Sequence, residues 1–361
     1  MSTTNTIDAV RRQNELAGAT QKDIGLSELN GFQLPRDLTE EFLDRMQEGI
    51  QILGMADTMV LERLEMDVPQ FGVPQLSGHT RDEEGSRTQS SNAESGRVQF
   101  NATDQQYYIL VEPRRDALKN THYSEDEFGQ YIIDEFIQRY GNDLGLIGIR
   151  AGASSGSLQT VGGAASLDTT FTGWLARAEG DTQSVDGQGD STRIGLEDTA
   201  TADAGSMPAI ANTDGSGTPQ PVDTSLFNQA IQTLPARYRN SDQFSPTLLT
   251  SPNNVQSYAM GLTEREDPIG SAVILGESEM TPFDYDLVGV NGWPDEYMMF
   301  TDPNNLAFGA FEQMELEQTT DTDKVHEQKL HSRNWMEAQF DFQIKQMQAG
   351  VLVTDIQPAT V

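Results

Sequence analysis

The sequence predicts an α+β fold, in which helices pack on sheets that are not built from regular strand–helix–strand units. Segments with helical spacing of apolar residues and segments with strict alternation occur along the same chain, and they follow one another in no regular series. Apolar residues make up 36% of the 361 and gather in these segments, whereas the stretches between them are polar. We therefore expect a folded chain with long polar excursions, and its length allows one large core or two moderate ones.

The N-terminal part is expected to hold an arm followed by a helix. Residues 1–36 are polar and short of core-forming side chains, which is typical of an extended arm. Over 37–62 the apolar residues Leu38, Phe42 and Met46 follow helical spacing. This pattern predicts a helix whose apolar stripe faces a core.

Two strands with a long polar insert between them are expected over 63–113. Alternation begins at Leu64 in RLEMDVPQFGVPQ, where Pro69 and Pro74 break the run, and it returns in RVQFNATDQQYYILVE. The insert, 77–96, is far longer than the about two to five residues usual in hairpin loops. It buries nothing within its own chain, so it is either disordered or ordered by a neighbouring subunit, and composition does not decide between the two.

The clearest helix is expected over 124–148. Its sequence, SEDEFGQYIIDEFIQRYGNDLGLIG, opens with a capping-box pattern at Ser124 and Glu127 and continues with apolar side chains at helical spacing. A helix of this length is about 30 Å long or more, enough to run the length of a domain. Because its apolar face is wide, other elements must cover most of its sides.

The region from 150 to 222 consists largely of Gly, Ala, Ser, Thr and Asp. One island, FTGWLARAEG at 171–180, carries large apolar side chains, and we expect Phe171 and Trp174 to anchor it to a core. The residues around this island are expected to form loops and short strands.

A further α+β region begins at Asp223. In YMMFTDPNNLAFGAF, at 297–311, turn-forming residues separate two apolar runs, which predicts a hairpin that serves as a stiff framework. The final segment, MEAQFDFQIKQMQAGVLVTDIQ, has two alternating runs separated by the turn-prone residues 348–350. Residue spacing also predicts a helix in TSLFNQAIQTLPARYR, a short strand in PTLLTSP, a second helix in NNVQSYAMGLTERED and strands in LVGVNGWP. The first of these helices is expected to carry Leu226, Phe227, Ala230, Ile231 and Leu234 on one face.

The charge balance narrows the possible partners. The chain has 56 acidic and 23 basic residues, a formal net charge of -33, and only five of the basic residues are lysine. Such a chain repels nucleic acid and anionic membranes in dilute buffer, so it either works in strong salt or binds a very cationic partner. The acidic excess is spread over the whole length, and together with the preference for arginine it favours a halophilic origin. At molar salt the Debye length falls to about 3 Å, which screens the surface repulsion.

Composition also excludes several kinds of chemistry and location. Because the chain has no cysteine, disulfides, thiolate nucleophiles and cysteine-based zinc sites are excluded. The N-terminus, MSTTNTIDAVRRQNELAG, lacks the apolar segment of a signal peptide, and no run of about 18 apolar residues occurs anywhere. We therefore expect the chain to be cytosolic when made, with no export signal and no membrane anchor.

No residue is predicted to be catalytic, to bind a cofactor or to ligate a metal. His326 and His331 are five positions apart, which places them on different faces of a helix. The carboxylates in 181–190 and 212–217 do not fit the spacing of a calcium loop. The glycine-rich runs lack the Lys-Ser/Thr ending of a phosphate loop, and no H-E-x-x-H motif occurs. No basic patch with interleaved aromatics supports nucleic-acid readout. An enzyme is therefore the weaker class.

Taken in order, these elements resemble the major capsid protein of tailed double-stranded-DNA viruses, which has the Hong Kong 97-like fold, and the halophilic composition is similar to that of the haloarchaeal members. The resemblance covers essentially the whole chain. The stretches that carry it are SEDEFGQYIIDEFIQRY as the spine helix, RLEMDVPQFGVPQ with RVQFNATDQQYYILVEP as the extended loop, FTGWLARAEG after the spine, and LVGVNGWPDEYMMFTDPNNLAFGAFEQMELE in the axial and peripheral domains.

The resemblance implies a division of the chain into the parts of that fold. The arm and the extended loop would reach neighbouring subunits, the spine helix would stiffen the peripheral domain, and the axial domain would pack around fivefold and sixfold axes. The implied parts are an N-terminal arm (1–36), a helix leading to the loop (37–62), the extended two-stranded loop (63–113), a peripheral domain with the spine helix 124–148 and small-residue loops (114–222), an axial domain (223–330) and C-terminal strands that return to the peripheral domain (331–361).

The implied function is structural and not enzymatic. The chain would assemble with itself into pentamers and hexamers of an icosahedral shell, which encloses viral DNA without sequence readout. It would be located in the virion after assembly in the host cytoplasm, without cofactors or membrane contact. Only 123 residues precede Ser124, and the arm, helix and loop take them up, so we expect a separate scaffolding protein, with portal and decoration proteins as further partners.

Two alternatives stay open at this point. An encapsulin-like shell around an enzyme cargo would have the same fold. A halophilic hydrolase, from a different class of protein, would be a compact monomer with a carboxylate-lined pocket.

Overall fold

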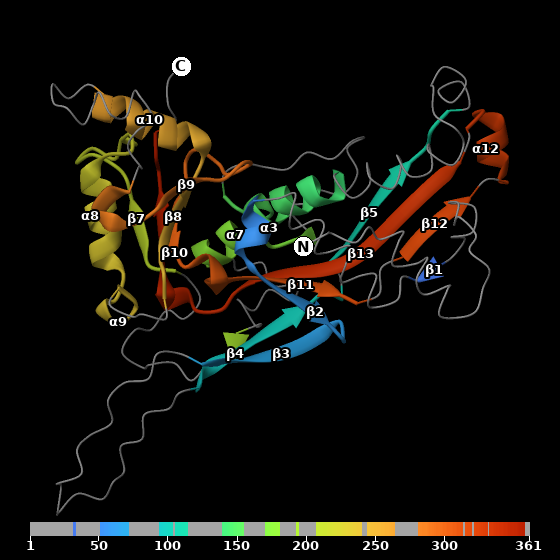
Figure 1. Ribbon diagram of the computed structural model, residues 1–361, viewed down its shortest axis with the longest axis horizontal. Coiled ribbons are helices and arrows are strands. Elements are labelled where there is room, and N and C mark those ends of the chain that lie inside the picture. The colour runs from blue at the N-terminus through green and yellow to red at the C-terminus, as the bar shows by residue number, and fades with distance from the viewer. Residues whose placement is uncertain are drawn as a thin grey trace, which may run out of the picture.

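In the computed structural model, the described strands form three sheets, and helices pack on two of them (Figure 1). This arrangement is the mixed α+β class that the sequence predicts. No helix among the described residues is long and apolar enough to cross a membrane. The structure describes residues 32–33, 51–71, 94–103, 105–114, 139–154, 170–180, 193–194, 207–239, 244–263, 281–312, 315–319, 321–330 and 332–357.

A six-stranded sheet forms the long diagonal part of the molecule in Figure 1. The longest strand, β13, pairs antiparallel with β12 and β5 along its first half and with β11 along its second half. The short strand β1 extends the sheet beyond β12, and β2 pairs parallel with β11. The strand order is β1 (Phe32–Gln33), β12 (Glu315–Thr319), β13 (Arg333–Ile344), β11 (Leu306–Phe311) and β2 (Asp57–Leu61), with β5 (Gln106–Val111) on β13.

A five-stranded sheet stands at the other end of the molecule. Neighbouring residues of its central strand enter different cores: Met298 and Phe300 lie in the cluster with the helices α8 and α10, whereas Met299 lies in the cluster with the long helix. Burial on both faces explains why these strands read as continuous apolar runs. The strand order is β7 (Ala209–Ala211), β14 (Gly350–Thr354), β10 (Met298–Thr301), β8 (Thr247–Thr250) and β9 (Leu287–Gly289).

Two predicted helices pack against this sheet (Figure 1). α8 (Thr224–Thr233) begins after Asp223, whose carboxylate accepts a hydrogen bond from the Leu226 N–H at 2.8 Å. This side-chain cap satisfies a backbone donor at the helix start. α10 (Pro252–Thr263) follows as the residue spacing predicts. The single helix predicted in TSLFNQAIQTLPARYR is wrong at its C-terminal end, because α8 ends before Pro235 and the short α9 (Ala236–Arg239) follows as a separate helix. The buried stripe of α8 is the predicted one: Leu226, Phe227, Ala230 and Ile231.

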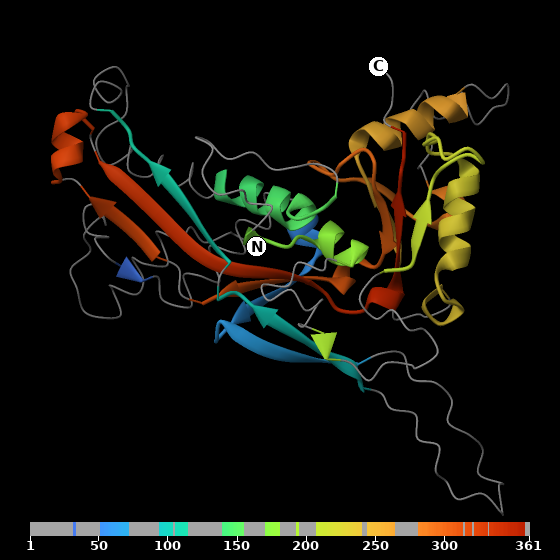
Figure 2. The same cartoon turned by 180° about the vertical axis from the view of Figure 1, so that it is seen from behind.

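The long helix packs on the six-stranded sheet, as Figure 2 shows from behind. It is described over 139–150, whereas the first part of the predicted 124–148 helix lies outside the described residues. Tyr140, Leu144 and Ile147 of this helix are buried in one core with aromatic residues of β11 and β13. The Tyr107 hydroxyl of β5 donates a hydrogen bond to the Asp143 carboxylate. Burial and this bond raise the pKa of Tyr107, so the hydroxyl keeps its proton and remains a donor.

The predicted island at 171–180 is anchored as expected, but it also forms a helix. Phe171 and Trp174 are 2% and 0% exposed. α7 (Trp174–Glu179) follows Gly173, its N-cap residue. An added Cβ at Gly173 would lie 2.7 Å from the backbone oxygen of Gly148. A side chain at position 173 would therefore push α7 away from the end of the long helix.

A small third sheet projects below the six-stranded sheet in Figure 1. It consists of β3 (Glu65–Phe71), β4 (Glu94–Asn101) and β6 (Arg193–Ile194). Pro69, predicted to break the first strand, lies inside β3 opposite Arg97. Because β3 is an edge strand, proline is tolerated there. The insert 77–96 lies mostly outside the described residues, and its last three residues belong to β4.

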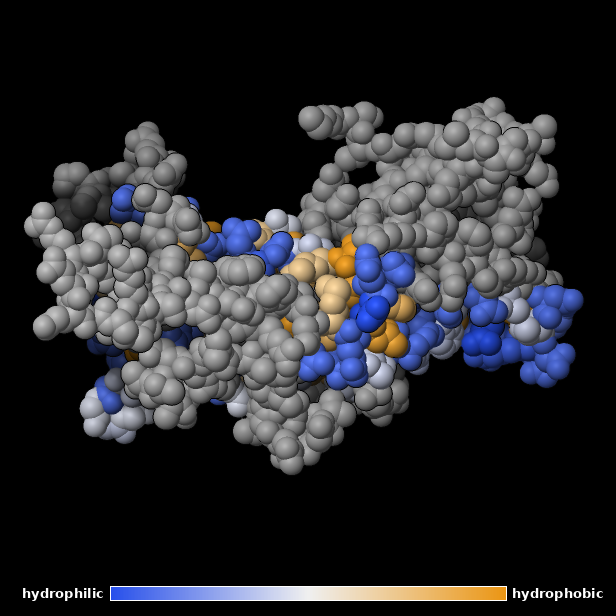
Figure 3. Space-filling view, turned by 90° about the horizontal axis from the view of Figure 1, so that it is seen from below, coloured by the Kyte–Doolittle hydropathy of each residue, from blue (hydrophilic) through white to orange (hydrophobic). Residues whose placement is uncertain are grey.

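The surface agrees with the polar composition. Seen from below (Figure 3), most of the described surface is hydrophilic, and apolar side chains show mainly in one area near the middle.

The prediction of a helix over 37–62 is wrong at its C-terminal end. α3 (Gln51–Met55) ends the helix, and β2 follows after a single residue. Thr58 and Val60 are β-branched and suit a strand, and β11 offers a free edge for parallel pairing. The part of this prediction before Gln51 lies outside the described residues.

The predicted hairpin at 297–311 is also wrong, because its two strands do not pair with each other. β10 pairs with β8 and β14, whereas β11 pairs with β13 and β2. Between them the 3-10 helix η3 (Pro303–Asn305) turns the chain from one sheet to the other. η4 (Met347–Ala349) does the same between β13 and β14. Turn residues predict a change of direction, but they do not determine the partner of each strand.

The ranges 223–330 and 331–361, which the resemblance assigns to an axial domain and to C-terminal strands, therefore do not coincide with the sheets. β11 and β12 fall within 223–330 but pair with β13, and β14 falls within 331–361 but joins the five-stranded sheet. Similarly, the alternating run 97–112 forms two strands, β4 and β5, which belong to different sheets. Alternation shows that a segment is a strand with two different faces, but it does not tell which sheet the strand joins.

Candidate functional site

The described residues hold no cluster that could bind a metal ion. No group of three or more His, Asp or Glu side chains in this part of the chain could hold a metal ion. His326, on α12 (Asp323–Glu327), is exposed, and its Nε2 lies 2.9 Å from the Asp321 carboxylate. His331 and the segment 181–190 lie outside the described residues.

The carboxylate in the segment 212–217 closes its own turn. Asp214 Oδ1 accepts hydrogen bonds from the Ser216 hydroxyl at 2.7 Å, the Ser216 N–H at 2.8 Å and the Thr218 N–H at 2.9 Å. These bonds, with that of the Ser216 hydroxyl first, hold the pKa of Asp214 below its ordinary value. The segment is a turn whose acidic side chain is used locally.

Buried polar side chains gather where the two larger sheets meet. β10 and β14 are antiparallel in one sheet, β11 and β13 are antiparallel in the other, and both connections bend at adjacent 3-10 turns. The two strand pairs thus form one bent ribbon that runs through both sheets (Figure 1). We call the bend, residues 301–305 and 345–349, the corner.

Asn305 joins the two turns of the corner. Its side chain is nearly buried, with 5% exposure of the residue. Nδ2 donates to the Gln346 carbonyl at 2.9 Å and to the Thr301 hydroxyl at 3.1 Å, and Oδ1 accepts from the Gln346 N–H at 2.8 Å. The side-chain amide therefore satisfies backbone groups that the sheet ladder cannot reach at the bend.

Asp302 ties the corner to a third segment. One carboxylate oxygen accepts from the Asn304 N–H at 2.9 Å, which caps η3, and the other accepts from the Ser245 N–H at 2.9 Å, just before β8. The corner is thus fixed by side chains on both of its turns and by a neighbouring segment. Such a bend holds one angle between the sheets.

A second buried cluster, which we call the loop base, joins the third sheet to the six-stranded one. Arg177 of α7 lies 3.0 Å from the Asp341 carboxylate of β13, and the two side chains are 7% and 0% exposed. The second Asp341 oxygen accepts from the Asn101 N–H of β4 at 3.0 Å and from Gln343 Nε2 at 2.9 Å. Gln343 Nε2 also donates to the Gln99 carbonyl of β4 at 3.2 Å. The strands that lead into the extended segment are thereby fixed to the body of the molecule.

The third sheet also approaches β11 closely. An added Cβ at Gly309 would lie 2.7 Å from a ring carbon of Phe100 and 3.0 Å from a methyl carbon of Leu61. Both residues belong to the small apolar core between β4, β2 and β11. Only glycine allows this contact without displacing the ring.

α7 connects the three sheets although it has only six residues. Besides the Arg177 contact, Trp174 Nε1 donates to the Ala307 carbonyl of β11 at 3.1 Å. Glu179, at the other end of α7, accepts a hydrogen bond from the Tyr297 hydroxyl beside β10. One short helix thus contacts both large sheets and, through Asp341, the third.

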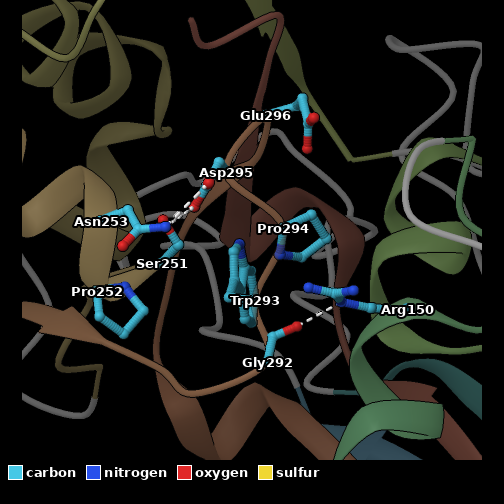
Figure 4. Close-up of a pocket in the computed structure, with 9 residues that line it drawn as sticks. All are labelled: Arg150, Ser251, Pro252, Asn253, Gly292, Trp293, Pro294, Asp295 and Glu296. Carbon is cyan, nitrogen blue, oxygen red and sulfur yellow. Dashed lines mark hydrogen bonds between the residues drawn. The ribbon is translucent and has the colours of Figure 1, made fainter. Parts of the chain in front are cut away.

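A pocket of about 480 Å³ lies between the end of the long helix and the five-stranded sheet (Figure 4). Arg150 donates from Nε to the Gly292 carbonyl at 2.5 Å, and Asn253 Nδ2 lies 3.1 Å from the Asp295 carboxylate. Ser251 is the one hydroxyl residue of the lining, and it accepts a hydrogen bond from the Asn254 N–H at the start of α10. The lining has no histidine, and its carboxylates are those of Asp295, beside the Asn253 amide, and Glu296.

The sequence did not indicate which residues make up these sites. Asp341 and Gln343 alternate with apolar residues, a pattern that reads as a solvent-facing side of a strand. β4 covers that side, so both residues are buried.

Comparison with known proteins gives matches by structure. No protein-family model matches the sequence, and no curated protein matches it. A chain of the satellite phage P4 procapsid, in a structure that includes the size determination (Sid) protein, is similar with a TM-score of 0.64 and 14% sequence identity, and the match covers 97% of this chain and 98% of that chain. A chain of the native gene transfer agent (GTA) particle capsid has a TM-score of 0.56 and 13% identity, covering 86% and 91%. A chain of the cyanophage A-1(L) capsid has a TM-score of 0.54 and 12% identity, covering 84% and 92%.

Because these identities are low, the matches concern the fold alone. They extend over nearly the whole of each compared chain, so the likeness is to complete subunits. The chain has the mixed α+β fold found in phage and gene-transfer-agent capsids.

Proposed function

We propose that this chain is the major capsid protein of a tailed double-stranded-DNA virus and that it assembles into an icosahedral shell around the viral genome. The observation that carries the proposal is the fold, which matches capsid subunits over 97% of this chain in the P4 procapsid structure.

The buried contacts of the corner, the loop base and α7 suit a shell subunit. A shell needs subunits that keep one shape, because small differences in angle between neighbours accumulate around a closed surface. The corner, the loop base and α7 fix the mutual orientation of the three sheets through buried contacts. In this proposal the subunits form pentamers and hexamers, and they contact DNA without reading its sequence.

The parts of the subunit keep the roles given by the resemblance. Residues 1–36 are the arm, and within 63–113 the strands β3 and β4 with the segment between them are the extended loop, whereas β5 belongs to the six-stranded sheet. The five-stranded sheet with α8 and α10 forms most of the axial domain. The peripheral domain contains the long helix and the six-stranded sheet. A separate scaffolding protein, a portal and decoration proteins are the proposed partners, and assembly takes place in the cytoplasm of a haloarchaeal host before the chain is found in virions.

The test is electron microscopy of the purified chain in molar salt. We expect closed particles of uniform diameter, formed by the chain alone or with a scaffolding protein. A monomer in size-exclusion chromatography, with no particles under any of these conditions, would contradict the proposal and would favour the hydrolase alternative. Particles from the native source that contain an enzyme and no DNA would instead indicate an encapsulin-like shell.

The extended loop has its own test, designed from the strand bounds. Replacing residues 77–93 by an Asn-Gly turn leaves β3 and β4 intact, because these strands end at Phe71 and begin at Glu94. We expect a folded subunit with unchanged circular dichroism that no longer forms stable shells, since intersubunit surface is lost while the subunit core remains. Normal particles from the shortened chain would contradict the assignment of the loop.

A further inference from the structure

The outward face of the six-stranded sheet carries an exposed aromatic pair among carboxylates. On β5, Ile109 is buried whereas Tyr108 is 53% exposed, so Tyr108 lies on the face opposite the core. On β13, Met336 and Ala338 are buried. Trp335 and Glu337 alternate with them and therefore lie on the same outward face as Tyr108.

The aromatic pair is held in a fixed geometry. The rings of Tyr108 and Trp335 are stacked, with centroids 4.4 Å apart and planes 8° apart. Trp335 Nε1 donates to the Glu337 carboxylate at 2.9 Å. On the neighbouring strand β12, Glu317 pairs in register with Trp335, and Glu315 pairs with Glu337. We call these five residues the aromatic–acidic face.

The carboxylates of this face are available to a partner. Glu315 and Glu317 are exposed, and within the described part of the chain none of the three carboxylates has a lysine or arginine partner. This differs from Glu112 near the end of the same strands, which pairs with Lys324 and Arg333. The face therefore combines negative charge with a flat aromatic surface, and no cation of the described segments neutralises it.

A guanidinium group fits this combination better than other side chains. It is planar and always charged, it stacks on aromatic rings, and it donates several hydrogen bonds to carboxylates at the same time. Tyrosine, tryptophan and arginine are also the residues enriched at the centres of protein interfaces. The stacking component persists in strong salt, in which simple ion pairs between exposed groups are screened.

We propose that the aromatic–acidic face binds an arginine side chain of a neighbouring copy of this chain. The proposal rests on the proposed function, because in a shell the neighbours of each subunit are copies of itself. The chain has 18 arginines and five lysines, so a cation presented by a copy is most often arginine. Nucleic acid and anionic lipid are excluded as occupants by the charge of the face.

Trp335 reports directly on this contact. Trp174 and Trp293 are 0% and 2% exposed, so Trp335 is the tryptophan that a neutral quencher such as acrylamide reaches in the free subunit. We expect its accessible fluorescence to be lost when shells form. Shells in which Trp335 stays as accessible as in the free subunit would overturn the inference alone, whereas a wild-type chain that forms no shells would overturn the proposed function with it.

Two substitutions test the recognition itself. Tyr108→Ser and Glu337→Gln should each raise the subunit concentration needed for assembly about two- to fivefold, the range expected for one exposed cation–π or charged contact. Tyr108→Phe keeps the stacked ring and should assemble normally. Glu327→Gln removes one exposed charge on α12, outside the face, and serves as the matched control.

Two measurements separate the loss of this contact from a loss of folding and from a general effect of charge. The urea midpoint of the free subunit should be unchanged in all four variants, because the altered side chains are at the surface. Normal assembly of both Tyr108→Ser and Glu337→Gln would overturn the inference. Free arginine amide should raise the assembly concentration of the wild type more than lysine amide at the same ionic strength, and it should lose this excess effect on Tyr108→Ser. Equal effects of the two amides on the wild type would show that the contact does not select arginine.

Discussion

Replacing Arg177 with methionine tests whether the loop base depends on its buried ion pair. Methionine keeps most of the side-chain length and removes the charge, so the Asp341 carboxylate, which is 0% exposed, would lose its counter-ion. Breaking a buried pair in this way costs about 3–5 kcal/mol, which shifts the folding equilibrium by roughly two to four orders of magnitude. Against a typical stability of about 5–15 kcal/mol, this is a large loss.

The assay is urea unfolding of the unassembled subunit, followed by tryptophan fluorescence. Lys345→Met is the matched control, because it removes the charge from the Lys345–Asp57 pair, whose side chains are 31% and 42% exposed. An exposed pair contributes about 0–1 kcal/mol, so the control should unfold close to the wild type. Similar losses in the two variants, or no loss in Arg177→Met, would refute the reasoning.

The other predictions concern the corner, the close contact of two sheets, and salt. Asn305→Ala removes three hydrogen bonds and should lower the free energy of unfolding by about 2–4 kcal/mol, as measured by thermal unfolding. The control Asn304→Ala, at the exposed neighbouring position, should cost about 0.5 kcal/mol. Equal melting temperatures of the two variants would contradict the role of the corner. Gly309→Ala should cost about 1–3 kcal/mol, because its Cβ would meet the Phe100 ring at 2.7 Å, and an unchanged urea midpoint would speak against this contact. Wild-type shells should persist in molar salt and weaken towards 0.1 M, where the Debye length is about 10 Å, and equal light scattering at both salt levels would count against a halophilic origin.

The sequence predicts the elements of this fold better than their pairing. The stripe of α8 was predicted residue by residue, since helical periodicity is a local property of the chain. The strands on either side of Asp302 to Asn305 were also predicted, but the predicted hairpin pairing between them was wrong. β10 finds its partners about fifty residues before and after it, whereas β11 pairs with β13, about thirty-five residues later, and with β2, about 250 residues earlier. Register and partner choice depend on contacts between distant segments, which spacing within one segment does not reveal.

The candidate site was harder to predict than the fold for a related reason. Asp341 and Gln343 have the spacing of surface residues, and Asn305 lies in a turn, where asparagine is common for purely local reasons. Each becomes significant only when another segment covers it: β4 for Asp341 and Gln343, and the turn at Gln346 for Asn305. Buried polar residues of this kind can be recognised once the tertiary contacts are known, and not before.

The placement of charge separates the stability of the subunit from that of the assembly. The contacts that join the three sheets, at Arg177, Asp341 and Asn305, are buried, and salt screens buried groups only weakly. Among the residues whose side chains the structure describes, Asp302 and Asp341 are the buried acidic ones, and the other carboxylates are at least partly exposed. The net charge of -33 is repeated in every copy, so repulsion between copies grows as salt is removed. A shell of such subunits should therefore come apart at a salt concentration at which each subunit is still folded. This order of events follows from the burial of the framework, and it would not be expected if exposed ion pairs such as Lys345–Asp57 held the sheets together.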